Sequence, residues 1–151
     1  MKKTERIGMV RRAVDDIERR KAEALAACDK DVRAAQAKLE ELEAYRTAYV
    51  RDFARRAESG MNGAGVREYQ VFLGRLDEAL RQQTQILAQA RLRRDAELEN
   101  WRDAARRAAA VGNLATHWQA EERAAAEKTE QKEADERSQQ VWSRRTIGHG
   151  S

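Results

Sequence analysis

The 151-residue chain contains no proline and one cysteine, and aromatic residues make up only 5% of it. Because proline is the strongest helix breaker, its absence leaves long segments uninterrupted. The single Cys28 excludes an internal disulfide and suits a reducing cytoplasm. There is no apolar run of about 18 residues. No apolar stretch follows the basic start at Met1–Arg6 either, so we expect neither a membrane span nor a secretory signal. Any membrane contact would then come through a protein partner.

Charged residues account for 37% of the chain, with 30 basic and 26 acidic side chains giving a net charge of +4. So polar a chain cannot bury enough apolar surface for a compact globule, which leaves disorder or a long coiled coil. Its richness in Ala, Glu, Lys, Arg, Leu and Gln at helical spacing favours the coiled coil. The even, interspersed balance of charge does not call for a nucleic-acid partner.

Glycine is concentrated in one place, because three of the eight glycines fall within Glu58–Gly65. Glycine adopts a positive φ without steric cost, so such a cluster ends a helix. We therefore predict an all-α fold: two long helices in an antiparallel coiled-coil hairpin, the second helix longer. The expected parts of this single domain (1–146) are a first helix at about 4–58 with Thr4 as N-cap, a turn at 59–65, a second helix at about 66–144, and a flexible tail at 147–151.

Apolar residues recur at steps of three and four along both predicted helices, which indicates a coiled-coil seam. The phase slips by one residue between Ile17 and Leu25, where Lys21 enters the seam. The first stripe comprises Ile7, Val10, Val14, Ile17, Ala24 or Leu25, Cys28, Val32, Ala35, Leu39, Leu42, Tyr45, Tyr49 and Phe53. The second comprises the rows Leu73, Leu80, Leu87, Arg94, Trp101, Ala108, Ala115 and Tyr69, Leu76, Gln83, Ala90, Glu97, Ala104, Val111, Trp118.

A hairpin folded about the glycine turn pairs residue i with roughly residue 124 minus i. The N-terminal start of the first helix then lies near Trp118, and beyond that point the second helix continues without a partner helix. Its continuation over Glu121–Glu136 is charged on all sides and has no partner within the chain. We expect this overhang either to fray or to be held by another protein.

Catalytic chemistry is missing from the sequence. A two-helix hairpin offers a seam and no pocket in which polar groups could converge. The only histidines are His117 and His149, no His/Cys cluster has metal-ligand spacing, and the glycine turn lacks the lysine of a nucleotide-binding loop. We expect a non-enzymatic protein with no metal, no cofactor and no small-molecule substrate, in which Cys28 is a seam residue.

One row of side chains could form a binding face on the second helix. Phe72, Leu76, Ala79 and Gln83 follow one another at helical spacing, and Ile86 extends the row. Alternatively, Phe72 folds over the turn and packs on Phe53. Spacing alone does not choose between these two readings.

The chain resembles the FliJ family, cytoplasmic components of the flagellar type III export apparatus. The segments that carry the resemblance are Tyr45–Tyr49, Tyr69–Ala79 with Gln82 and Gln83, Trp101–Arg102, and Glu130–Glu136. Their order and spacing extend over nearly the whole chain.

The resemblance implies a hairpin similar to the central stalk of rotary ATP synthases, docked in the hexameric ring of the flagellar export ATPase and promoting its assembly and activity. It also implies contact with the cytoplasmic domain of the export-gate membrane protein and escort of export chaperones, at the inner face of the cell membrane at the flagellar base. The implied gate-binding residues are Phe72, Leu76, Ala79 and Gln83, where some members carry histidine instead of Gln83. The implied ring-binding residues are Gln131, Lys132, Asp135 and Glu136.

Two other functions are compatible with a charged hairpin. One is a coiled-coil scaffold, unrelated to export, that associates with itself through the same row. The other is a nucleic-acid-binding hairpin that uses the basic residues Arg11, Arg12, Arg19, Arg20 and Lys21, although acidic neighbours make it the weakest of the three.

Overall fold

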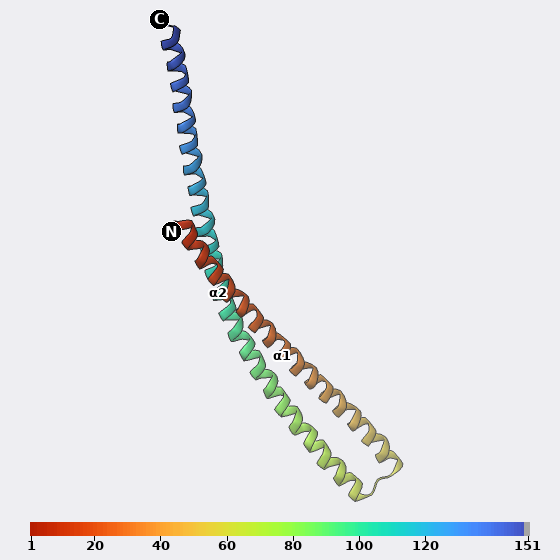
Figure 1. Ribbon diagram of the computed structural model, residues 1–151. Coiled ribbons are helices and arrows are strands. Elements are labelled where there is room, and N and C mark those ends of the chain that lie inside the picture. Colours follow the sequence, from red (N-terminus) through yellow and green to blue (C-terminus); the bar gives the residue numbers. More distant parts are fainter. Residues whose placement is uncertain (150–151) are drawn as a thin grey trace. The chain divides into compact units, whose positions relative to one another are not determined.

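The computed structural model describes residues 1–149, which form two helices and no strand. Helix α1 covers Lys3–Ser59 and helix α2 covers Gly63–His149, with 57 and 87 residues (Figure 1). The chain divides into two units, which we describe separately: unit 2 is Glu18–Ala104, and unit 1 combines Met1–Ile17 with residues 105–149. In each unit a part of α1 packs antiparallel on a part of α2. This confirms the predicted helical hairpin with a longer second helix.

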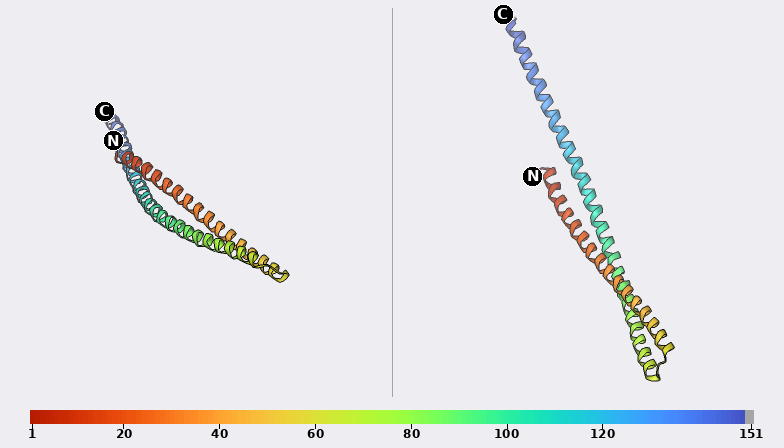
Figure 2. Two further views of the ribbon diagram at one scale, coloured as in Figure 1. Left: turned by 90° about the horizontal axis from the view of Figure 1, so that it is seen from below. Right: turned by 90° about the vertical axis from the view of Figure 1, so that its right-hand side faces the viewer.

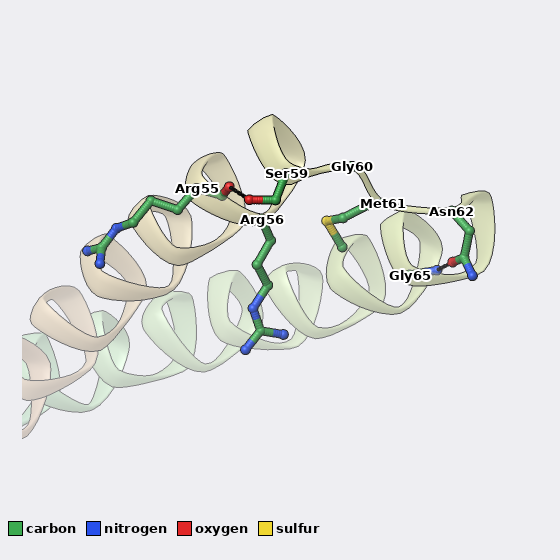
Figure 3. A pocket seen from close by; sticks show the side chains of 7 residues that line it. All are labelled: Arg55, Arg56, Ser59, Gly60, Met61, Asn62 and Gly65. Atoms are coloured by element: carbon green, nitrogen blue, oxygen red, sulfur yellow. Dashed lines mark hydrogen bonds between the residues drawn. The ribbon is translucent and has the colours of Figure 1, made fainter.

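The turn of unit 2 is shorter than the predicted 59–65, because it consists of Gly60–Asn62 alone. Gly60 has a φ of 95° and ends α1, with its N–H donating to the carbonyl of Ala57 at 3.2 Å. Asn62 caps α2, since its Oδ1 accepts a hydrogen bond from the N–H of Gly65 at 2.8 Å (Figure 3). With the cap at Asn62, both Gly63 and Gly65 belong to the first turn of α2 and not to the loop.

The beginning of α1 also differs from the prediction that Thr4 is the N-cap. The helix starts at Lys3, and the carbonyl of Lys2 accepts hydrogen bonds from the N–H groups of Glu5 and Arg6, each at 3.1 Å. Thr4 is therefore inside the helix. Its hydroxyl donates a hydrogen bond to the Glu122 carboxylate of α2.

The core of unit 2 lies midway between the turn and the far end of the unit. Val32 and Ala35 of α1 pack with Leu87 and Ala90 of α2, and Leu39 covers them from the side. The two alanines allow a close approach of the helices, because no long side chain separates their backbones. All members of the two rows predicted on α2 are buried or half-buried in their own unit, so the seam of this helix was correctly predicted.

The phase slip of α1 has the effect of placing a carboxylate in the seam of unit 2. Glu18 is half-buried and accepts a hydrogen bond of 2.8 Å from the indole N–H of Trp101. Ile17, which the sequence placed in the seam, is 47% exposed, and Val10 of unit 1 is 46% exposed. Lys21 is half-buried, as its predicted seam position requires.

Unit 1 has a smaller apolar core, consisting of the buried side chains Ile7 and Ala115. Beyond this core α2 continues as a single helix (Figures 1 and 2). Every residue from Glu121 to Gly148 is exposed. The helix extends past the predicted end at about 144 and includes Ile147–His149, where we expected a flexible tail. The remainder of that expected tail, residues 150–151, lies outside the described residues.

Candidate partner-binding surfaces

The row implied to bind the export gate lies in unit 2, on the side of α2 that faces α1. Leu76 is buried, with 7% of its surface exposed, while Phe72, Ala79 and Gln83 are half-buried. Gln83 donates a hydrogen bond from Nε2 to the main-chain carbonyl of Ala35 at 3.1 Å. The row is therefore shared with the seam between the helices, and only its edges reach solvent.

Five aromatic rings pack together toward the turn end of unit 2, and we call them the aromatic cluster: Tyr45, Tyr49, Phe53, Tyr69 and Phe72. Phe72 packs on Tyr49 and Tyr45, with ring centroids 4.6 and 6.2 Å apart, and not on Phe53. Phe53 instead stacks on Tyr69 at 3.8 Å, and Tyr69 stacks on Tyr49 at 4.5 Å. Each such pair stabilises by about 0.5–1.5 kcal/mol beyond the area it buries. The cluster thus holds the turn end of the two helices together.

Polar groups adjoin the aromatic cluster from both helices. Arg46 of α1 donates from Nε to Oδ1 of Asp77 on α2 at 2.6 Å, and this bond and the carboxylate charge raise the pKa of Arg46. The hydroxyl of Tyr69 is buried and has no hydrogen-bond partner among the described residues. Its burial, followed by the influence of Tyr49, raises the pKa of Tyr69.

What remains available to a partner at this end is the outer edge of the cluster. Tyr45 is 52% exposed and Val71 is 57% exposed. On α2, Phe72 and Val71 contribute apolar surface to a shallow groove whose other walls include Arg67 and Arg75. A partner that contacts this end therefore meets the edges of two aromatic rings and an aliphatic side chain between arginines.

In unit 1 the first residues of α1 are pinned to α2. The Lys2 ammonium lies 3.3 Å from Oε1 of Glu122, and the Lys3 ammonium lies 4.0 Å from the ring centroid of Trp118. Hydrogen bonds from Thr4 and then Lys2 lower the pKa of Glu122. These contacts lie at the N-terminal limit of the pairing between α1 and α2, near Trp118, where the sequence predicted that the pairing stops.

The residues implied to bind the ATPase ring lie beyond this point, on the part of α2 that continues alone. Gln131, Lys132, Asp135 and Glu136 are all exposed on regular helix. Gln131 and Asp135 are one turn apart, as are Lys132 and Glu136, so the four form two neighbouring rows on one side of the helix. The structure brings them together without any contribution from α1.

One surface was missed by the sequence interpretation, which described Glu121–Glu136 as charged on all sides and did not consider the residues that follow. Val141, Trp142 and Ile147 are 51%, 71% and 74% exposed. The signal was present in the sequence, because Gln119–Gln140 contains no apolar residue larger than alanine before these three appear. A shallow hollow beside two of them is lined by Ala134, Arg137, Ser138, Val141, Trp142 and Arg145.

Among the described residues, no group of His, Cys, Asp and Glu side chains is arranged to hold a metal ion. No helix in this part of the chain is long and apolar enough to cross a membrane. Cys28 is a free, half-buried thiol within unit 2.

Comparison with known proteins shows which family the chain resembles along its length. The family model described as flagellar FliJ protein matches residues 3–146, which is nearly the entire chain. Comparisons with curated proteins and with solved structures found no match. The matched range includes the glycine turn, the aromatic cluster and most of the single-helix part of α2. The chain therefore belongs to the flagellar FliJ protein family, whose members are components related to flagellar export.

Proposed function

We propose that this protein is a non-enzymatic stalk and adaptor of the flagellar export apparatus, held by the hexameric export ATPase at the unpaired part of α2. The observation that carries the proposal is that residues 121–148 are exposed along their whole length, beyond the point where Lys3 meets Trp118. A helix that is exposed on all sides gains nothing from packing within its own chain, so a partner that surrounds it gives it a reason to persist.

The ring-binding residues under this proposal are Gln131, Lys132, Asp135 and Glu136. Their mixed charge suits a partner that presents charges of both signs. Binding would favour ring assembly because one stalk contacts several subunits at once, and assembly would raise the rate of ATP hydrolysis. The stalk itself contributes no catalytic group to this reaction.

The opposite end of unit 2 is proposed to contact the cytoplasmic domain of the export-gate membrane protein. Phe72 and Ala79 are the half-buried members of the implied row that combine apolar character with partial exposure. Leu76 and Gln83 would support this surface from the seam, whereas Tyr45 and Val71 would widen it. Export chaperones are further proposed partners. The protein would then work at the inner face of the cell membrane, at the flagellar base, through protein contacts alone and without nucleic acid.

The testing experiment is co-purification with the export ATPase, scored for ring assembly and for the hydrolysis rate. We compare the full chain with a chain that ends at Ala126. The shorter chain keeps Glu122 and its contacts with Lys2 and Thr4, so unit 1 retains its α1 pairing. The proposal predicts that the full chain stimulates the ATPase and that the shorter chain does not, while both bind the gate domain. Equal stimulation by both chains would refute the assignment of this end.

The second candidate function is a coiled-coil scaffold that associates with itself. It is favoured by apolar side chains on the outer surface of α2 in unit 2, where Ile86 is 49% and Leu92 is 70% exposed. Sedimentation at micromolar concentration separates the two functions. A monomer supports the stalk, whereas a stable dimer that dissociates on Leu92→Ser substitution supports the scaffold.

A further inference from the structure

The character of the unpaired part of α2 changes abruptly at Arg137. Residues 121–136 contain seven acidic and three basic side chains. Residues 137–148 contain Arg137, Arg144 and Arg145 and no acidic side chain at all. The segment 137–148, which we call the basic end, is thus a separate surface from the mixed-charge stretch that holds the residues implied to bind the ring.

The basic end also carries the large apolar side chains of the unpaired helix. Trp142 is 71% exposed, an unusual state for the residue type that buries the most apolar area. Trp142 and Val141 flank a hollow whose rim includes Arg137 and Arg145. A large aromatic side chain between arginines is the composition typical of residues that dominate the binding energy of a protein interface.

The apolar side chains of the basic end do not share one side of the helix. At about 100° per residue, Ile147 lies roughly 120° away from Val141 and still further from Trp142. A flat bilayer surface could accept only one of these sides at a time. A groove or channel that encloses the helix accepts them all.

Pairing of the basic end with a second copy of itself is opposed by charge. An antiparallel pairing centred on Val141 sets Arg137 of one copy beside Arg145 of the other. A parallel pairing sets each arginine beside its own counterpart. Both arrangements bring like charges together without an acidic residue in the segment to offset them.

We propose that the basic end is an anchor that inserts Trp142 and Val141 into an apolar groove of a partner protein rimmed by carboxylates, which pair with Arg137, Arg144 and Arg145. The partner is the export ATPase, so this inference rests on the proposed function and adds a second contact to it. The mixed-charge rows from Gln131 to Glu136 orient the helix in the ring, and Trp142 supplies most of the affinity.

The test measures binding of full-length protein variants to the purified ATPase hexamer. Trp142→Ala is expected to weaken binding on the order of 30-fold, the loss typical of a dominant interface residue. Arg145→Glu is expected to weaken it by about tenfold, with a loss that shrinks at high salt. Ser143→Ala is the matched control, because it also places alanine on the exposed helix, and it leaves binding unchanged. Alanine favours helix, so the loss in Trp142→Ala does not come from unfolding. Circular dichroism checks the helix content of all three variants.

The outcomes separate the two levels of the proposal. If the natural protein binds the hexamer and Trp142→Ala binds equally well, the anchor is refuted and the stalk stands. If the natural protein does not bind the hexamer, the stalk falls and the anchor with it. Binding to phosphatidylglycerol vesicles that is lost in Trp142→Ala would identify a membrane as the occupant and overturn the proposal. So would a dimer of the natural protein that Trp142→Ala dissociates.

Discussion

Gln83 of α2 donates a hydrogen bond of 3.1 Å from its side-chain amide to the main-chain carbonyl of Ala35 on α1. This bond crosses the seam beside the core of unit 2, where Ala35 packs with Leu87. A half-buried polar side chain that finds its partner at one position only also fixes the register of the two helices. Family resemblance implied a gate contact for Gln83, and its geometry adds a role within the hairpin.

Substitution of Gln83 should therefore lower the stability of the hairpin, whether or not it also weakens gate binding. Gln83→Ala is expected to lower the free energy of unfolding by about 1 kcal/mol, the usual worth of a buried neutral hydrogen bond. Urea unfolding followed by circular dichroism measures the change. The neighbouring Gln82 is exposed and serves as control, since Gln82→Ala should leave the curve unmoved. A Gln83→Ala variant as stable as the natural protein would refute the proposed role of Gln83 in fixing the register of the helices.

Two side chains of unit 2, one buried and one exposed, allow stability and gate binding to be separated. Leu76 is buried, so Leu76→Ala should cost about 2–4 kcal/mol in the free energy of unfolding. Tyr45 is 52% exposed at the edge of the cluster, so Tyr45→Ala should cost less stability than Leu76→Ala while weakening gate binding. Thermal unfolding and titration with the gate domain provide the two readouts. If Tyr45→Ala binds the gate like the natural protein, the exposed edge of the cluster is not the contact.

The hydroxyl of Tyr69 is a buried polar group without a partner, which leads to a prediction for alkaline pH. Because the pKa of Tyr69 is raised above its ordinary value of 10.0, the stability linked to this group is complete below that value. It is lost as the pH rises through the higher pKa of the folded state. Tyr69→Phe should leave stability unchanged or higher at neutral pH and reduce the loss in alkali. Tyr45→Phe is the control, and an alkaline profile that Tyr69→Phe does not alter would contradict the prediction.

The contacts of Glu122 give a matching prediction for acid. Its pKa is held below the ordinary value of 4.5 by Thr4 first and Lys2 second. The stabilising effect is therefore complete above pH 4.5 and is lost as the pH falls through the lower pKa of the folded state. Carbon-13 titration of the Glu122 carboxylate should show the lowered pKa, and Thr4→Val should return it toward 4.5. An unchanged pKa in Thr4→Val would show that the hydroxyl does not bind the carboxylate.

Periodicity predicted the hairpin and the seam of α2 because each depends on spacing, which the sequence displays directly. The cap at Asn62 and the position of Thr4 could not be read in the same way. Both depend on a choice between competing hydrogen-bond partners, and Thr4 has one on the other helix. Spacing placed Ile17 in the seam, but the phase slip gave that position to Glu18, which the Trp101 indole stabilises.

For the binding surfaces, the sequence identified the row that begins at Phe72, but it did not show how much of each side chain in the row is buried. Leu76 shares its heptad position with Tyr69 and Gln83, and burial of such a residue depends on how α1 packs against it. At the other end, the heptad pattern stops after Trp118, so spacing assigns no role to Trp142. Its exposure depends on α2 continuing as a single helix to His149, which the sequence pattern did not predict.

The most direct test of the stalk is hydrogen exchange of the full chain with and without the export ATPase hexamer. Alone, the amides of residues 127–149 should exchange quickly, because an unpaired helix frays readily, whereas the amides around Ala35 and Leu87 should exchange slowly. The account predicts that the hexamer slows exchange in 127–149 and leaves the turn end of unit 2 unchanged. Protection that appears at the turn while 127–149 continues to exchange quickly would contradict it.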